Sequence, residues 1–221
     1  VGVVDLVASV VEGLPPGTLL DLDSLPIEAA EVMAAGIEKA GHRPVNEQYT
    51  SAAVLDLPST VDEYLEAIGK KQRHELRRKR RRYEEVVGEV IFERCSGEGW
   101  ALDEFIRLHR VSGGDKGGFM TQAMADLFSR LATLPGWSID ILRHPDGDTA
   151  TACLFSFTDD EGYYLYNSSF DIDFSEASPG NVLLSSAIES TIELGLSRFD
   201  FLKGDEVYKY RLGAISRPLY R

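Results

Sequence analysis

Two short polar stretches near the C-terminal end of the chain carry the residue types that could hold a ligand and do chemistry. The first is the turn at residues 178–181, Ser-Pro-Gly-Asn, which leads into an apolar helical pattern over residues 180–195. The second is residues 203–209, where lysines, carboxylates and a tyrosine follow a short buried strand predicted over residues 198–202. In open α/β sheets, ligands bind at helix N-termini and at the carboxyl ends of strands. The two stretches therefore predict a ligand site.

The spacing of apolar residues predicts the elements that position these two stretches. A capping-box pattern, Thr60-x-x-Glu63, predicts the start of a long helix that carries a basic run to about residue 83. Turn residues at 145–148 and 159–162 predict two β-hairpins. The predicted elements are helices over 1–14, 26–41, 60–83, 100–111, 121–134 and 180–195, strands over 18–23, 44–57 (two short strands), 88–95, 137–144, 149–158, 163–169, 198–202 and 213–219, a Gly-rich loop over 112–118 and a polar loop over 170–179.

The composition is typical of a soluble globular protein with one large or two small domains. The chain has 221 residues, of which 43% are apolar and 27% charged. No apolar run approaches the roughly 20 residues that a membrane helix needs, so no membrane insertion is expected. Cys95 and Cys153 both lie in strand-like apolar runs, which favours buried free thiols in a reducing cytoplasm over a disulfide. These features predict a cytoplasmic protein.

Charge is distributed very unevenly along the chain. Residues 70–82 hold nine Lys or Arg and one Glu, although the whole chain has a net charge of −13. The remainder has 14 basic against 35 acidic residues, a net of −21. The acidic body argues against DNA binding, whereas the basic run predicts a local anionic partner, such as phosphate groups or an acidic face of another subunit. The alternative is a solvated helix whose charge the acidic body balances.

A series of short motifs runs in order along residues 61–211. They include Leu76-Arg77-Arg78, Leu108-His109-Arg110, Asp146-Gly147, Tyr164-Leu165-Tyr166, Phe170-Asp171, Ser178-Pro179-Gly180, Leu183-Leu184, Phe199-Asp200-Phe201, Gly204-Asp205-Glu206 and Tyr208-Lys209. From residue 88 the predicted elements follow the order β-α-α-β-β-β-α-β-(α)-β. This order resembles the GNAT acyltransferase fold, and the motifs resemble its CelD/BcsL-type (Acetyltransf_6-like) branch, which is related to the FemAB peptidyltransferases. The resemblance implies an α/β fold with a mixed central sheet flanked by helices.

The first 58 residues repeat the predicted order of elements at the C-terminal end. Even Leu20-Asp21-Leu22 echoes Phe199-Asp200-Phe201. Proteins of the family that the chain resembles are built from two GNAT-like halves. The resemblance therefore implies that residues 1–58 are the C-terminal part of a first, truncated GNAT-like half, with further chain before them. Residues 59–221 would then be a complete GNAT-like domain with an N-terminal basic helix. An α/β subdomain of unrelated origin is the alternative.

The resemblance implies that acetyl-CoA or another acyl-CoA is the co-substrate. Its pyrophosphate would lie on Ser178, Gly180 and Asn181, where backbone N–H groups and a helix dipole attract anions and where glycine lets the chain approach closely. Arg73 and Arg77 share a helix face at i, i+4 spacing and could bind further phosphates. Typical GNAT enzymes have a longer, basic and glycine-richer loop here, so the alternative is an ordinary helix start with proline at its first position.

The resemblance also implies catalytic roles for the polar cluster. Glu206, or Asp205 in its place, would accept the proton of the acceptor. Tyr208 would protonate the leaving thiolate, with Tyr210 as its rival. Lys209 resembles the lysine that FemAB enzymes place near the acyl carbonyl, where it would stabilise an oxyanion. A solvated loop with a local Lys–Glu pair is the alternative.

Four further residues lie on or after predicted strands. Tyr166 and Asn167 lie on the central strand, where GNAT sheets splay and offer a backbone N–H to the thioester carbonyl. Asp171, which follows that strand, could orient the acceptor amine. Asp200 is expected to fix the loop after its strand by accepting backbone N–H bonds. The four histidines are scattered without ligand spacing, so no metal site is predicted.

These observations favour an N- or O-acyltransferase, foremost an N-acetyltransferase, that acts on an amino sugar, an amino acid or a similar small acceptor. A second hypothesis is FemAB-like aminoacyl transfer from charged tRNA to a peptidoglycan precursor, which the basic run favours and the acidic body disfavours. The third is a degenerate GNAT domain that serves as a scaffold in polysaccharide biosynthesis, which the unusual phosphate loop supports. The sequence does not indicate an oligomeric state.

Overall fold

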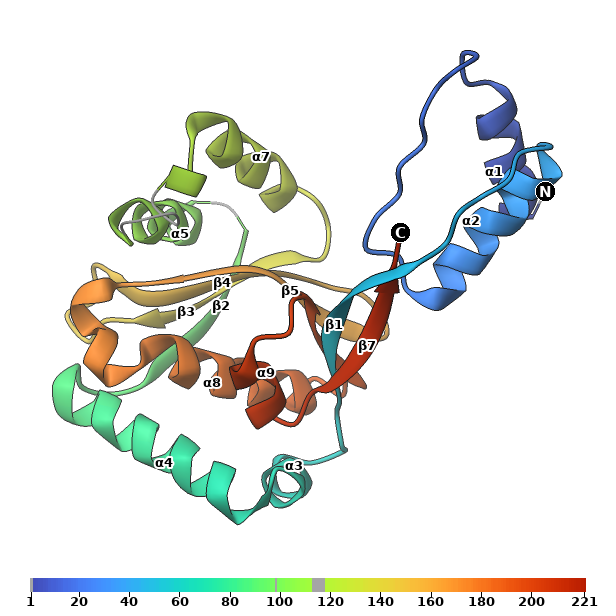
Figure 1. The fold of residues 1–221 in the computed structure, drawn as a ribbon. Coiled ribbons are helices and arrows are strands. Elements are labelled where there is room, and N and C mark those ends of the chain that lie inside the picture. The colour runs from blue at the N-terminus through green and yellow to red at the C-terminus, as the bar shows by residue number, and fades with distance from the viewer. Residues whose placement is uncertain (1, 98, 113–117) are drawn as a thin grey trace.

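The computed structural model describes residues 2–97, 99–112 and 118–221, and it contains a twisted sheet with helices on both faces (Figure 1). The Gly-rich loop predicted over residues 112–118 lies almost wholly outside these residues. The helices are α1 (Val3–Glu12), α2 (Ile27–Lys39), α3 (Val61–Ala67), α4 (Gly69–Val86), α5 (Trp100–Val111), α7 (Gln122–Ala132), α8 (Pro179–Glu193), α9 (Val207–Arg211) and the 3-10 helix η1 (Ile172–Ala177). The strands are β1 (Gln48–Asp56), β2 (Ile91–Ser96), β3 (Trp137–Arg143), β4 (Ala150–Thr158), β5 (Gly162–Phe170), β6 (Arg198–Lys203) and β7 (Ile215–Tyr220).

The seven strands form one mixed sheet in the order β2-β3-β4-β5-β6-β1-β7. Strands β3, β4 and β5 form the two predicted antiparallel hairpins, and β2 pairs antiparallel with β3. The chain then crosses over through α8, so that β6 runs parallel to β5. This confirms the predicted α/β fold with a mixed central sheet flanked by helices.

Strand β1 lies inside this sheet, between the two strands that end the chain. It pairs antiparallel with β6 on one side and with β7 on the other. Residues 52–55, Ala-Ala-Val-Leu, are all buried, as expected for a strand that is covered on both faces. The two short strands predicted within 44–57 are therefore wrong, because the polar residues before the apolar run also pair with β7. The predicted boundary at residue 58 does not divide the sheet, and the origin of residues 1–58 from another half stays a prediction.

Residues 18–23 form no strand, so that prediction is wrong. Their alternating Leu and Asp residues have the period of a strand, but no strand of the described chain pairs with them. Leu19 is 87% exposed, and backbone pairing with the sheet begins only at Leu25, which forms an isolated bridge with Tyr220. Sequence alternation was misleading here because a strand also needs a neighbour.

The long helix predicted from Thr60 to residue 83 is broken into α3 and α4. Its start is confirmed: the Thr60 hydroxyl accepts the Glu63 N–H at 3.2 Å, and the Glu63 carboxylate accepts the Thr60 N–H at 3.2 Å. The break lies at Gly69, which has a φ of +78°. Glycine adopts this left-handed conformation readily, whereas it costs free energy for other residues. The basic run therefore lies on a separate helix, α4, whose direction is set by this turn.

Two layers of helices enclose separate cores (Figure 1). On one face, α8 covers the sheet and α4 lies outside it, with Tyr163 and Phe199 stacked at 4.5 Å in the core. On the other face, α5 and α7 enclose Phe105, Phe128 and Phe155, whose ring centroids lie 4.9–5.2 Å apart. Alternate residues of β4 belong to opposite cores, Ala152 and Leu154 to the first and Cys153 and Phe155 to the second.

Helices α1 and α2 form a hairpin beyond the β7 edge of the sheet, close to the C-terminus (Figure 1). Gly36 is buried in this hairpin, where a Cβ atom would collide with Val7. The Arg217 guanidinium of β7 holds Glu28 of α2 at 2.8 Å. No helix in the described part of the chain is long and apolar enough to cross a membrane.

The turn between α3 and α4 yields a test of the fold. We expect Gly69→Ala to lower the free energy of unfolding by about 1–2 kcal/mol, because a Cβ is disfavoured at positive φ even though nothing lies within 4 Å of it. Gly118→Ala is the control, since Gly118 has the same open surroundings without a positive φ. Urea denaturation measures both variants, and equal midpoints would contradict the assigned turn.

Candidate active site

Strands β5 and β6 separate part-way along their length. They pair only where Gly162–Tyr164 lie beside Arg198–Asp200, although β5 continues to Phe170 and β6 to Lys203. Since the two strands are parallel, their carboxyl ends lie at the same edge of the sheet, next to the start of the crossover helix α8. The separation expected after the central strand is therefore present.

A β-bulge in β5 changes which side chains face the separation. Phe155 of β4 lies opposite Asn167, whereas the next residue, Ser156, lies opposite Leu165, so Tyr166 is the extra residue. The bulge places the side chains of Tyr166 and Asn167 on the same face, toward α5 and α7. The Tyr166 ring lies 5.9 Å from that of Phe128 in α7 and is 43% exposed. Tyr166, predicted to bind the co-substrate, therefore lies on the face opposite α8.

The start of α8 is a helix N-terminus without a side-chain cap. Ser178 adopts a left-handed conformation (φ 54°, ψ 47°), and Pro179 occupies the first helical position. The N–H groups of Asn181 and Val182 donate back to the Ser178 carbonyl at 3.0 and 3.3 Å. Within the described chain, the Gly180 N–H has no hydrogen-bond acceptor. One backbone donor and the positive end of the helix dipole are thus available to an anion.

A cavity of about 200 Å³ lies between α4 and the first turns of α8. Three of the predicted phosphate-binding residues, Arg73, Arg77 and Asn181, line it together. The Arg73 guanidinium also donates to the Leu65 carbonyl at 2.9 Å, and this hydrogen bond ties the Arg73 side chain to the end of α3. Ser178 and Gly180 lie in the turn that leads to Asn181, so the structure brings five of the six predicted phosphate or co-substrate contacts to one end of α8.

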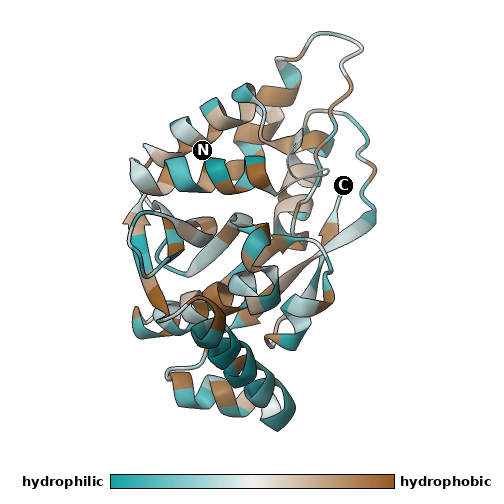
Figure 2. Ribbon diagram, turned by 90° about the vertical axis from the view of Figure 1, so that its left-hand side faces the viewer, coloured by the Kyte–Doolittle hydropathy of each residue, from teal (hydrophilic) through white to brown (hydrophobic). Residues whose placement is uncertain are grey.

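Helix α4 is the strongly hydrophilic helix at the bottom of Figure 2. Several of its cations have carboxylate partners, among them Arg82 with Glu176 of η1 at 3.1 Å and Arg80 with Glu189 of α8 at 3.8 Å. Within the described residues, no carboxylate lies within ion-pair distance of Lys70, Lys71, Arg77 or Arg81. The basic run is therefore only partly neutralised by the body of the protein.

Lys209 is buried beneath the loop that joins β6 to α9. Its side chain is 4% exposed, and its ammonium lies 2.8 Å from the Glu206 carboxylate. The same nitrogen donates to three carbonyl oxygens at 3.2–3.3 Å, those of Phe201, Lys203 and Gly204. An ammonium has three hydrogens, so these local partners occupy all of them. The geometry indicates that Lys209 holds the loop, and its contact with an acyl oxyanion stays a prediction. The alternative of a solvated pair is wrong in one respect, because Lys209 is buried.

Glu206 and Tyr208, the other predicted catalytic residues of this loop, remain accessible to different degrees. The Glu206 side chain is 57% exposed at the start of α9. Tyr208 is half-buried against the core, and burial together with the nearby Glu206 charge raises its pKa to about 12. Glu206 can therefore exchange protons with solvent, whereas Tyr208 holds its phenolic proton.

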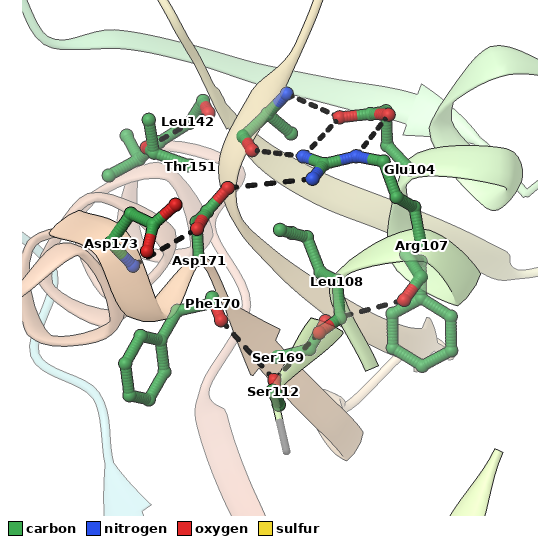
Figure 3. Close-up of polar contacts among 12 residues, drawn as sticks. Glu104, Arg107, Leu108, Ser112, Leu142, Thr151, Ser169, Phe170, Asp171 and Asp173 are labelled. Carbon is green, nitrogen blue, oxygen red and sulfur yellow. Dashed lines mark hydrogen bonds and ion pairs between the residues drawn. The ribbon is translucent and has the colours of Figure 1, made fainter. Parts of the chain in front are cut away.

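Asp171 lies at the end of β5, in a polar network with α5 and β4 (Figure 3). Arg107 extends between the Glu104 carboxylate, which it grips at 2.8 and 2.9 Å, and Asp171, at 3.4 Å. The other Asp171 oxygen accepts the Asp173 N–H at 3.1 Å and so begins η1. These contacts occupy both oxygens of the carboxylate that was predicted to orient an acceptor amine.

Asp200 fixes the end of β6, as predicted. Its carboxylate accepts the Leu202 N–H at 2.7 Å and supports the positive φ of 55° at that residue. Burial raises the pKa of Asp200, and the Leu202 hydrogen bond opposes this shift. Asp200 is therefore a loop-stabilising residue.

One polar contact in the site has no signal in the sequence. His109 of α5 and Asn167 of β5 are 58 positions apart and lie 2.9 Å apart through Nε2 and Oδ1. The motif Leu108-His109-Arg110 is local and gives no hint of the partner across the sheet. Only the packing of α5 on β5 brings the two residues together.

Comparison with known families identifies the chain. Residues 70–210 match the sequence profile of the family described as Acetyltransferase (GNAT) domain. The chain belongs to this family. The match covers more than half of the chain and confirms the resemblance drawn from the motifs. GNAT proteins are acyltransferases, and members of the family typically use acyl-CoA.

Solved structures with low sequence identity share this GNAT fold. They include the C-terminal domain (DUF2156) of a putative lysylphosphatidylglycerol synthetase from Agrobacterium fabrum, with 13% identity and a TM-score of 0.56, and L-PGS from Bacillus licheniformis, with 14% and 0.59. FemX has 10% identity and a TM-score of 0.61. Each synthetase match covers 80% of this chain and 60% of the other, and the FemX match covers 89% and 70%. The chain thus spans about 60% of the length of the synthetase chains, and the likeness is one of fold.

No curated protein matches the sequence. Among residues 2–97, 99–112 and 118–221, no group of three or more His, Cys, Asp or Glu side chains is arranged to hold a metal ion.

The role of Lys209 yields a test by stability. We expect Lys209→Met to lower the free energy of unfolding by about 2–3 kcal/mol, because the buried carbonyl of Phe201 and the carbonyls of Lys203 and Gly204 lose their donor. Glu206→Gln is the matched control and should cost less than about 1 kcal/mol, since the amide oxygen of glutamine can still accept from the Lys209 ammonium. Chemical denaturation of both variants decides between holding the loop and contacting a ligand. Equal, small losses would contradict the structural role.

Proposed function

We propose that this GNAT protein transfers an acyl group, foremost acetyl, from acyl-CoA to an amine or hydroxyl of a small acceptor such as an amino sugar or amino acid. The observation that carries the proposal is the parting of β5 and β6 directly beside the uncapped start of α8. A thioester could lie between the strands while its phosphates lie at the helix start. Family membership supports the reaction class.

The donor would be held by the first turn of α8 and by α4. The Gly180 N–H and the helix dipole are placed for a pyrophosphate oxygen, and Asn181 adds a side-chain amide. Arg77 lines the same cavity and has no carboxylate partner among the described residues, so a phosphate would meet an unneutralised guanidinium there. This arrangement replaces the longer basic loop of typical GNAT enzymes with side chains from a neighbouring helix.

The acyl transfer requires one bond to form and one to break. The acceptor nitrogen or oxygen attacks the thioester carbon, and the carbonyl electrons move to its oxygen. Collapse of this oxyanion breaks the C–S bond, and the thiolate takes the proton of Tyr208. The acceptor proton leaves to Glu206, or to Asp205 in its place, through water. Lys209 acts on this reaction by holding the loop that carries Glu206 and Tyr208.

Aminoacyl transfer from charged tRNA is the second candidate function. The unpaired cations of α4 favour it, because a tRNA backbone would neutralise several of them at once. The fold shared with FemX adds to this alternative. A non-catalytic scaffold is the third candidate, which the absence of a typical basic loop before α8 supports.

Calorimetric titration with acetyl-CoA and, separately, with coenzyme A tests the donor. We expect micromolar binding that Gly180→Leu weakens at least about tenfold, because the side chain would occupy the phosphate position. The backbone accepts a side chain at this position, since a Cβ at Gly180 meets only Phe170, at 3.7 Å, and φ is not positive.

Ala123→Leu is the matched control for this titration. Ala123 occupies the second position of α7, as Gly180 does in α8, and it is exposed. Its substitution should leave both affinities unchanged. Absence of binding to either ligand by the unaltered chain would reject the acyl-CoA proposal and leave charged tRNA as the next ligand to titrate.

The pH dependence of turnover tests Tyr208 as the proton donor. With its pKa raised to about 12, Tyr208 stays protonated as the pH rises through the alkaline range, so its ionisation should cause no loss of rate below about pH 11. Tyr208→Phe should slow release of coenzyme A by about 100-fold with acetyl-CoA affinity unchanged. The measurement is the rate of coenzyme A release from pH 7 to 11 with an acceptor that supports turnover. A normal rate for Tyr208→Phe would exclude this role.

A further inference from the structure

His109 is held in one orientation between α5 and β5. It is 2% exposed, and its ring packs 4.4 Å from Phe105 and 5.9 Å from Phe119. Its Nδ1 atom lies 3.0 Å from the Phe105 carbonyl, and its Nε2 atom lies 2.9 Å from Oδ1 of Asn167. Both oxygens only accept, so His109 makes the two hydrogen bonds together only as the imidazolium, in which each ring nitrogen carries a hydrogen; in that form it is held on both sides and supports Asn167 rigidly.

The amide of Asn167 is oriented by two groups. The Ser168 N–H donates to Oδ1 at 2.7 Å, and a backbone N–H requires an oxygen there. The His109 Nε2 contact is made to the same oxygen. The Nδ2 group is therefore directed away from both partners, and within the described residues it has no acceptor. Asn167 is half-buried, with an oriented amide donor that the folded chain does not use.

Asn167 belongs to the part of β5 that no longer pairs with β6, where the acyl group of the proposed reaction would lie. Asn167 directly follows the bulged Tyr166 and comes after Tyr164, the last residue of β5 that pairs with β6. A thioester between the separated strands would thus have Asn167 beside it, on the face of α5. Side-chain amides are among the donors that stabilise oxyanions.

We propose that Asn167 is a catalytic residue that donates from Nδ2 to the acyl carbonyl oxygen, and that His109 is the positioning residue that holds it. The inference rests on the proposed use of acyl-CoA. In this arrangement Asn167 contacts the acyl group, whereas α8 and α4 would contact the phosphates at the other end of the ligand. Binding of the acyl group can therefore be measured separately from binding of the rest of coenzyme A. The ratio of the affinities for acetyl-CoA and coenzyme A reports on the contacts made to the acyl group, and the change in this ratio on substituting Asn167 reports on its side chain.

The experiment is calorimetric titration of the full chain and its variants with acetyl-CoA and coenzyme A. The unaltered chain should prefer acetyl-CoA. Asn167→Ala should reduce that preference by about fivefold to tenfold and leave the coenzyme A affinity in place, which also demonstrates folding. His109→Phe keeps the aromatic packing without the Nε2 contact and should reduce the same ratio. His109→Gln, which can donate to Asn167, should restore most of it.

Ser168→Ala is the matched control, because Ser168 lies opposite Leu154 and so faces α8. It should not change the ratio. Equal ratios for Asn167→Ala and the unaltered chain would overturn the inference while the acyl-CoA proposal stands. If His109→Phe keeps the preference for acetyl-CoA, the positioning role of His109 is overturned. Failure of the unaltered chain to bind either ligand would overturn both proposals.

Discussion

The candidate site depends on how short the parallel pairing between β5 and β6 is. Three residues of each strand pair, and the two strands then diverge. The divergence is stable because β6 has a second neighbour: it stays paired with β1 out to Lys203, which lies opposite Ala52. The opposite edge of β5 remains paired with β4 up to Phe170. Each strand is thus held from its outer side, so the facing backbone groups of β5 and β6 beyond Tyr164 and Asp200 are not paired with each other.

Buried polar groups then fix the conformation of β6 beyond its pairing with β5. Beyond Asp200, its last residue paired with β5, β6 has a positive φ at Leu202. A non-glycine residue keeps such a conformation only if its surroundings enforce it. Asp200 satisfies the Leu202 N–H, and the Lys209 ammonium gathers the carbonyls on either side. The polar cluster that looks in sequence like a set of catalytic groups is therefore partly the framework for them. Glu206 and Tyr208 are left at its surface.

Much of this architecture could be predicted from the sequence, and the failures have a common physical cause. The helix at 100–111, the two hairpins and the role of Asp200 depend on local periodicity, turn chemistry and short-range hydrogen bonds. The failures concern features that depend on neighbours in space. These are the absence of a strand at 18–23, the burial of Lys209 and the contact between His109 and Asn167. A period of two indicates an extended chain without telling whether a neighbouring strand exists. Spacing along a chain likewise cannot show whether a lysine faces carbonyls or water.

The charges of α4 indicate what kind of ligand could bind at the start of α8. Arg78 and Arg82 have carboxylates within 3.1 Å, but exposed pairs of this kind contribute little. Arg77 and Arg81 are like charges at i, i+4 spacing without carboxylate partners among the described residues, an arrangement that weakens an isolated helix by a few tenths of a kcal/mol. The pair of like charges therefore does not stabilise the fold. A phosphate bound against Arg77 would relieve the repulsion within the screening length of about 8–10 Å. The pattern therefore weighs in favour of an anionic ligand at this end of α8 and against a merely solvated helix.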